Sequence, residues 1–142
     1  MSTYNTITSL SESPLNENHI YAGTDDGLIH YTKNNGSEWV TMSVDKLPNL
    51  PKSSFVNDIK ADLHDVNTVY VALDNHKFGD YSPYLFKSKD GGKSWKSIVE
   101  GLPKETLIWR IVQDHIDPNL LFLATEYGLY FSNNQGEKWI QE

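Results

Sequence analysis

The stretch SKDGGKSW, from Ser88 to Trp95, places a hydroxyl, a carboxylate and two glycines ahead of a tryptophan. An aspartate in such a segment can accept hydrogen bonds from the backbone N–H groups of its own turn, and glycine permits left-handed backbone there. A buried tryptophan removes roughly 150 to 250 Å² from water. The stretch therefore predicts a tight turn between two strands, with the indole ring folded into the gap between neighbouring sheets.

Two other segments repeat this pattern, TKNNGSEW at 32–39 and SNNQGEKW at 132–139. In the outer copies an asparagine replaces the aspartate, which keeps the accepting oxygen but removes the charge. Glu38 and Lys138 stand where the second hydroxyl would be, so we expect one hydrogen bond fewer in those turns. The residues expected to build the three turns are Thr32, Asn34, Gly36 and Trp39; Ser88, Asp90, Gly92, Ser94 and Trp95; and Ser132, Asn134, Gly136 and Trp139.

Short runs of β-branched and aromatic residues surround each copy and predict four strands per repeat. The expected strands are 5–10, 56–61 and 109–114 for the first; 18–24, 67–73 and 119–125 for the second; 28–32, 84–88 and 129–132 for the third; and a fourth that opens at each tryptophan. The tryptophans are spaced 56 and 44 residues apart, close to the period of propeller blades. We therefore predict an all-β chain of three four-stranded antiparallel propeller blades. They form one repeat domain over 1–142, with blades at about 4–44, 55–100 and 108–142.

The eight-residue pattern resembles the Asp-box, or bacterial neuraminidase repeat, of β-propellers in sialidases, xyloglucanase-type glycoside hydrolases and sortilin-type receptors. The middle copy matches it at all five defining positions. The resemblance implies a propeller fold and a structural role for the boxes, which in that family lie at the periphery, away from any active centre. It also suggests an extracytoplasmic location for full-length relatives, although 1–10 shows no secretory signal and the compartment stays open.

Three blades do not close a ring, because propellers need about four to eight. The outer blades would each expose an apolar side, which marks an interface or a missing partner. We expect a head-to-tail homodimer that completes a six-bladed ring, or further sequence that supplies the remaining blades.

Composition excludes several classes of function. The absence of cysteine excludes disulfides and thiolate chemistry. The net charge of −7, with no basic cluster, argues against nucleic-acid binding, and the apolar runs are too short to span a membrane. Turn positions explain the pairs His64–Asp65 and His115–Asp117 better than a metal site does, so no metal and no cofactor are expected.

One surface carries the candidate binding site. Connections between second and third strands share a propeller face with the links between blades, here Val44–Ser54, Asp74–Pro83 and Val99–Leu107. The middle connection is several residues longer than its counterparts, and long loops on rigid scaffolds often carry binding groups. The residues expected to contact a carbohydrate or peptide are His76, Phe78, Asp80, Tyr81 and Tyr84. The alternative is that Phe78 and Tyr81 cover the central opening or the dimer contact.

Catalysis by this chain is not expected. The sialidase resemblance implies three arginines and a tyrosine nucleophile, and Arg110 is the only arginine. Glycoside hydrolysis needs only two carboxylates at a suitable separation, for which the candidates are Asp58, Asp62, Asp74, Asp80 and Asp114. The sequence thus predicts a non-catalytic interaction or ligand-binding scaffold. The alternative is part of a glycoside-hydrolase-like enzyme that acts on polysaccharide.

Overall fold

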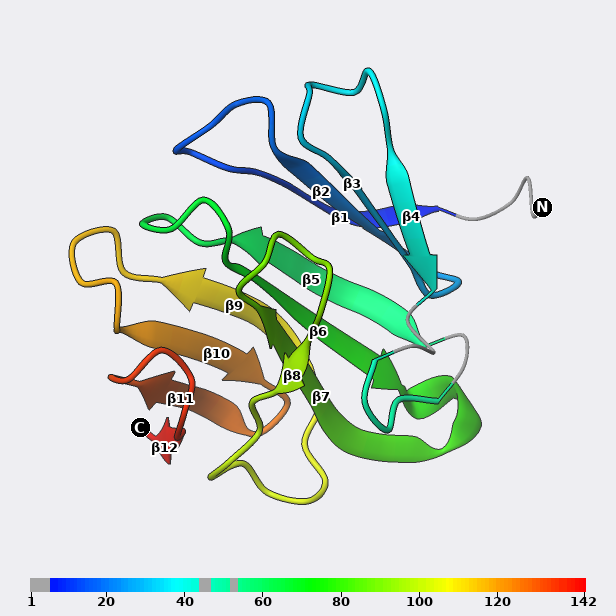
Figure 1. The fold of residues 1–142 in the computed structure, drawn as a ribbon. Helices are drawn as coiled ribbons and strands as arrows, with labels where there is room; N and C mark the ends of the chain where they lie inside the picture. The colour runs from blue at the N-terminus through cyan, green and yellow to red at the C-terminus, as the bar shows by residue number, and fades with distance from the viewer. Residues whose placement is uncertain (1–5, 44–46, 52–53) are drawn as a thin grey trace.

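The computed structural model describes residues 6–43, 47–51 and 54–142, which form three four-stranded antiparallel sheets (Figure 1). We call them blades 1, 2 and 3. Their strands are β1 (Ile7–Glu12), β2 (Ile20–Thr24), β3 (Leu28–Thr32) and β4 (Val40–Ser43); β5 (Phe55–Ala61), β6 (Val69–Asn75), β7 (Asp80–Ser88) and β8 (Lys96–Ser97); and β9 (Ile108–Gln113), β10 (Leu121–Thr125), β11 (Gly128–Ser132) and β12 (Ile140–Gln141). Each sheet is a meander in sequence order, so the predicted fold class of three propeller blades is confirmed.

The first strand of each blade lies on the inside of the arrangement, where β5 contacts both β1 and β9. Side chains on these strands bind backbone groups of the next blade. The Ile59 and Ala61 amides donate to the hydroxyls of Ser9 and Ser11, each at 2.9 Å. Hydrogen bonds between the inner strands therefore join successive blades without a shared sheet.

Each blade has two apolar faces, because successive side chains of a strand point to opposite sides. We call the side turned toward the preceding blade the leading face, and the side turned toward the following blade the trailing face. One buried cluster lies between blades 1 and 2 and another between blades 2 and 3. Trailing-face members include Tyr21, Ile29 and Tyr31 of blade 1 and Tyr70, Ala72 and Leu85 of blade 2, and leading-face members include Val56, Ile59 and Phe86 of blade 2 and Ile108, Ile111 and Trp139 of blade 3.

Three details of the sequence-based expectation are wrong. The long connection of blade 2 is shorter than expected, because β7 starts at Asp80 and Asn75 pairs with Asp80 in the β6–β7 ladder. Only the 3-10 turn η2 (His76–Phe78) and Gly79 separate the two strands. The tryptophans precede the fourth strands rather than opening them, and β8 and β12 contain only two residues each.

Parts of other predicted segments lie outside the described residues. These are Asn5, at the start of the first predicted strand, and residues 44–46 and 52–53 of the link between blades 1 and 2. Within the described residues, no helix is long and apolar enough to cross a membrane.

Candidate functional site

The three eight-residue turns share one hydrogen-bond pattern. In the middle copy, the Ser88 hydroxyl donates to Asp90 at 2.8 Å and accepts the Gly92 amide at 2.9 Å. Asp90 also accepts the Ser94 amide at 2.9 Å, and its second oxygen accepts the Ser94 hydroxyl. The same bonds from the first hydroxyl recur from Thr32 and Ser132.

The outer copies keep these bonds, apart from the one that the Ser94 hydroxyl donates, with asparagine in place of aspartate. The amides of Glu38 and Lys138 donate to Asn34 and Asn134 at 2.9 and 3.1 Å. Charge matters only in the middle copy, where hydrogen bonds from the Ser94 hydroxyl and amide hold the pKa of Asp90 down to about 2. Each turn also binds the turn between the first two strands of its own blade, through Asn35 to Asn18, Gly91 to Asn67 and Gln135 to Asn119. We call this the box end of the blades.

The tryptophans that follow these turns differ in burial. Trp139 is 2% exposed and its indole N–H donates to the Ile98 carbonyl of blade 2 at 2.8 Å. Trp95 is half-buried against the cluster between blades 1 and 2. Trp39, on the leading face of blade 1, is 47% exposed. The predicted packing between sheets is therefore seen for Trp95 and Trp139, whereas no blade among the described residues covers Trp39.

The opposite end of the blades, which we call the loop end, carries an acidic residue at the same position in each blade. In blades 1 and 3 the side chain of this acid accepts a backbone amide just before the first strand of the same blade. Asp25 accepts the Thr6 amide at 2.9 Å, and Glu126 accepts the Leu107 amide at 3.0 Å. Asp74 occupies the position in blade 2 and makes different contacts.

Asp74 is 1% exposed, and its carboxylate binds His76 rather than an amide of the inner strand, although Asp74 itself pairs with Phe55 of β5. One carboxylate oxygen accepts the His76 amide at 3.0 Å and also contacts its Nδ1. The other oxygen is buried and has no hydrogen-bond partner among the described residues. The imidazole itself is partly exposed and lies edge-on to Trp109 of blade 3, with ring centroids 6.3 Å apart and an interplanar angle of 83°.

The other four predicted contact residues lie on the same hairpin as Asp74 and His76. Phe78 is 73% exposed and Tyr81 is 45% exposed, so neither covers a core. Asp80 and Tyr84 instead bind each other, and Asp80 also accepts the Ser82 amide at 3.0 Å. Although partial burial acts in the opposite direction, the bonds from Tyr84 and Ser82 hold the pKa of Asp80 below its usual value. Asp80 and Tyr84 therefore brace the hairpin, while His76, Phe78 and Tyr81 present surface.

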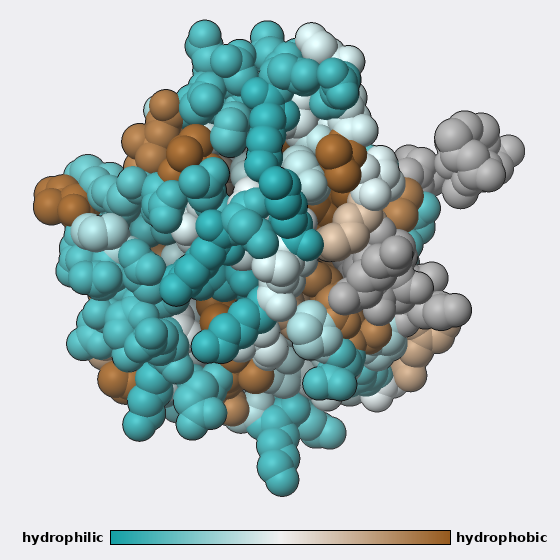
Figure 2. Space-filling view, viewed as in Figure 1, coloured by the Kyte–Doolittle hydropathy of each residue, from teal (hydrophilic) through white to brown (hydrophobic). Residues whose placement is uncertain are grey.

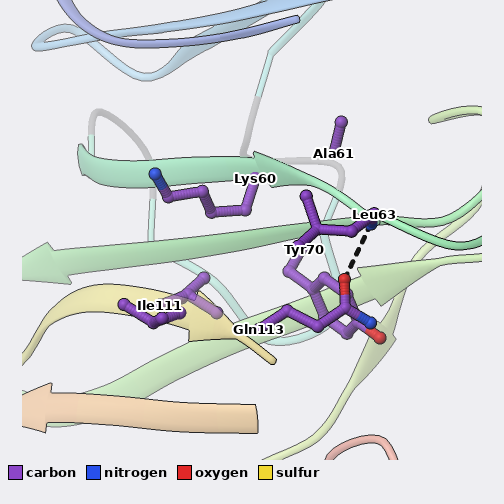
Figure 3. Close-up of a pocket in the computed structure, with 7 residues that line it drawn as sticks. Lys60, Ala61, Leu63, Tyr70, Ile111 and Gln113 are labelled. Carbon is purple, nitrogen blue, oxygen red and sulfur yellow. Dashed lines mark hydrogen bonds between the residues drawn. The ribbon is translucent and has the colours of Figure 1, made fainter. Parts of the chain in front are cut away.

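A pocket of about 160 Å³ lies elsewhere, between β5 and β9 (Figure 3). Its lining residues are Lys60, Ala61, Leu63, Tyr70, Ile111, Val112 and Gln113. The Gln113 side chain crosses from blade 3 and accepts the Leu63 amide at 2.7 Å, the bond dashed in Figure 3. The pocket is mostly apolar and its polar groups join two blades, so we assign it a packing role.

The candidate carboxylates other than Asp74 are occupied by the fold. Asp58 accepts the Ile111 amide at 2.8 Å and the Ser9 hydroxyl, so it links blade 2 to both neighbours, and burial raises its pKa. Asp62 accepts the Tyr70 hydroxyl, the Gln113 amide group and two turn amides.

Asp114 accepts two turn amides, from Ile116 and Asp117, and these lower its pKa. Among the described residues, no group of three or more acidic or histidine side chains could hold a metal ion.

Sequence reasoning missed the contact of His76 with Trp109 and the isolation of Asp74. Trp109 is the second residue of the inner strand β9, 33 residues away, and nothing local marks it as a neighbour of the hairpin. A usable signal was present in the repeats: an acid follows the second strand in each, and only in blade 2 is a histidine found two positions later.

No family model and no curated protein matches the sequence. Solved structures match the fold. YCF48 bound to D1 peptide superposes with a TM-score of 0.73 and 16% identity, over 99% of this chain and 41% of that one. The GH74 xyloglucanase from Xanthomonas campestris gives 0.69 and 14%, over 95% and 23%. The β-propeller domain of Myceliophteria thermophila Cps50 (Swd1) gives 0.62 and 16%, over 88% and 38%.

These matches show a β-propeller fold, since identities this low carry no further information. The chain spans less than half the length of each of these matched chains.

Proposed function

We propose that the chain is an Asp-box propeller unit that acts as a non-catalytic scaffold and binds a peptide at the loop end of blade 2. The contact residues are His76, Phe78 and Tyr81, with Trp109 of blade 3 beside them. Asp80 and Tyr84 hold the hairpin in place. The proposal combines the turn pattern, the exposed aromatic residues and the different role of Asp74.

The main observation behind the proposal is that the Asp74 side chain does not bind an inner-strand amide, as those of Asp25 and Glu126 do. A carboxylate can only accept hydrogen bonds, so its contact with Nδ1 of His76 fixes a proton on that nitrogen. In neutral histidine this leaves Nε2 as an acceptor. The buried acid thus orients a partly exposed imidazole, and a peptide N–H group is the natural donor to it.

The aromatic residues supply the apolar part of such a site. Exposed phenylalanine and tyrosine side chains on a braced hairpin lose little conformational entropy when they bind, and aromatic residues are enriched in binding hot spots. The structure of YCF48 bound to D1 peptide is a similar propeller with a peptide ligand, and this likeness supports a peptide as the ligand class here.

An array of synthetic peptides, probed in parallel with an array of oligosaccharides, tests the proposal. We expect the chain to select peptides, and the double variant Phe78→Ala/Tyr81→Ala to bind the best peptide about tenfold or more weakly, the effect of losing about 1.4 kcal/mol. The matched control is Tyr127→Ala, because Tyr127 is an exposed tyrosine at the corresponding connection of blade 3. A folded double variant that binds as tightly as the unchanged chain would refute the site.

The second candidate function is part of a glycoside-hydrolase-like enzyme, favoured by the fold match to a GH74 xyloglucanase. Hydrolysis needs two carboxylates that flank the substrate, whereas Asp58, Asp62 and Asp114 are held by bonds within the fold. Release of reducing sugar from xyloglucan that is lost on changing a single aspartate to asparagine would favour the enzyme.

Both outer blades expose apolar faces, so the scaffold also includes a partner at each end. That partner is either a second copy of the chain or further blades of a longer propeller. The partial coverage of the matched propellers supports both.

A further inference from the structure

The outer blades expose the same positions that the inner junctions bury. On the leading face of blade 1, Ile7 and Leu10 are 61% and 64% exposed. Their register equivalents are Val56 and Ile59 in blade 2 and Ile108 and Ile111 in blade 3, each at most 1% exposed. The leading face of blade 1 is therefore built as half of a blade junction.

The glycines of the box turns show the same contrast. A Cβ atom on Gly92 would meet Tyr31 of blade 1 at 3.3 Å, and one on Gly136 would meet Ile98 of blade 2 at 2.7 Å. At Gly36, a Cβ atom would meet only the turn's own Trp39, at 3.6 Å. All three glycines have a positive φ, which favours glycine at each position. At Gly92 and Gly136 the preceding blade also packs closely, whereas the surface around Gly36 and Trp39 is left uncovered.

The trailing face of blade 3 is the other half of such a junction. Val112 and Leu129 are exposed there, and Phe122 and Phe131 are partly exposed. The corresponding Tyr70 and Leu85 of blade 2 are buried against blade 3. Figure 2 shows one side of the molecule, where hydrophilic residues cover most of the surface and hydrophobic residues form separate patches, several of them near the edge.

Charge distinguishes these outer faces from the inner junctions. At the position where Ser9 and Asp58 accept an amide of the next blade, blade 3 carries Arg110, the only arginine of the chain. Two residues beyond Leu10, on the same leading face, blade 1 carries Glu12 where blades 2 and 3 have Ala61 and Gln113. Both charged residues are exposed. The Arg110 guanidinium donates to the Asn57 carbonyl at 3.2 Å and to the Trp109 carbonyl at 2.7 Å, so it is turned toward blade 2. The leading face of blade 1 carries an exposed anion at Glu12.

We infer that two copies of this chain associate head to tail, with the trailing face of blade 3 packed on the leading face of blade 1 of the second copy. A two-fold axis repeats the junction, and six blades close the ring, within the range of about four to eight at which propellers close. The contact covers Trp39 and, by the register of the internal junctions, places Val112 opposite Glu12 of the partner copy. The inference goes beyond the proposed function and does not depend on the peptide site.

Cysteine crosslinking tests the junction directly, because the chain contains no cysteine of its own. The Ser11 hydroxyl lies 2.9 Å from the Ala61 amide across the first internal junction, so the equivalent residues of the proposed junction, Val112 and Glu12, lie within disulfide range. We expect a mixture of Val112→Cys and Glu12→Cys chains to form one mixed disulfide dimer on mild oxidation. Neither variant alone should crosslink, because the two faces differ.

The double variant Ser11→Cys/Ala61→Cys is the geometric control, since it should form the same crosslink within one chain. Failure of the mixed dimer to form while this control closes would overturn the inference. Equal crosslinking of Val112→Cys chains with themselves would also overturn it, because that result requires two trailing faces to meet.

Native mass measurement provides an independent test. We expect a species of two 16.2 kDa chains that is lost in Leu10→Asp and in Leu129→Asp. Ile116→Asp should retain it, since Ile116 is highly exposed but lies in the turn between β9 and β10. A folded monomer at micromolar concentration would contradict the inference, and peptide binding by that monomer would leave the proposed function intact.

Discussion

The box end and the loop end of the blades differ in how strictly they repeat. At the box end, all three blades use the same bonds between the first hydroxyl, the side-chain oxygen and the glycine amide, and the middle turn differs by its charge and the added bond from the Ser94 hydroxyl. At the loop end, blades 1 and 3 repeat an acid-to-amide bond, and blade 2 replaces it with the Asp74–His76 pair. An end that repeats is explained by folding alone, whereas the single departure needs another cause, and ligand binding provides one.

We expect the largest loss of stability from removing the buried indole at the box end. Trp139→Ala should lower the free energy of unfolding by about 3 to 5 kcal/mol, because it leaves a cavity between blades 2 and 3 and leaves the Ile98 carbonyl unpaired. Urea unfolding measures the effect. Trp95→Ala is the graded control, since Trp95 is only half-buried and should cost less. Equal losses would contradict the assignment.

A smaller effect comes from the charge of the middle turn. The pKa of Asp90 is about 2 in the folded chain and about 3.9 when unfolded, so its charge stabilises the fold above pH 4. That stabilisation is lost as the pH falls from about 4 to 2. Asp90→Asn, which copies the asparagine of the outer turns, should remove this pH dependence. The part of the free energy of unfolding that is lost should be less than about 1 kcal/mol, because the carboxylate is exposed to solvent.

Unfolding at pH 5 and pH 3 compares the two chains. Glu17→Gln is the control, because Glu17 is an exposed acid outside the three box turns. If Asp90→Asn loses as much stability between pH 5 and pH 3 as the unchanged chain does, other carboxylates cause the loss.

The smallest expected change in the free energy of unfolding comes from position 35, where the three box turns differ in residue type. Asn35 has a φ of 57°, and glycine occupies the equivalent position 91 with a φ of 73°. Asn35→Gly should raise the free energy of unfolding by up to about 0.5 kcal/mol, because glycine adopts this backbone without strain. Asn35→Ala should lower it. Thermal unfolding distinguishes the two, and the opposite order would show that the asparagine side chain matters more than the backbone.

Most of the fold could be predicted from the sequence, because its signals are local. Alternating strands, glycine at positive φ and the spacing of hydroxyl, acid and tryptophan all act within about ten residues. The short β8 and the early start of β7 could not be predicted, since hairpin pairing between Asn75 and Asp80 extends a strand through residues that look like a loop.

The candidate site could be predicted only in part. The extra length at His76 to Tyr81 pointed to the hairpin, but the roles within it depend on contacts. Asp80 and Tyr84 turn inward to each other, and Trp109 reaches His76 from another blade. The exposure of Trp39 likewise depends on which blade precedes it, which its own turn cannot reveal.

One paired measurement tests most directly whether the loop end binds the ligand and the box end only stabilises the fold. Asp74→Asn and Asp90→Asn make the same chemical change at the loop end and at the box end. Binding of the best array peptide should weaken about tenfold or more in Asp74→Asn and stay unchanged in Asp90→Asn, which should instead alter the acid dependence of unfolding. Equal loss of binding in both variants, or none in Asp74→Asn, would contradict the account.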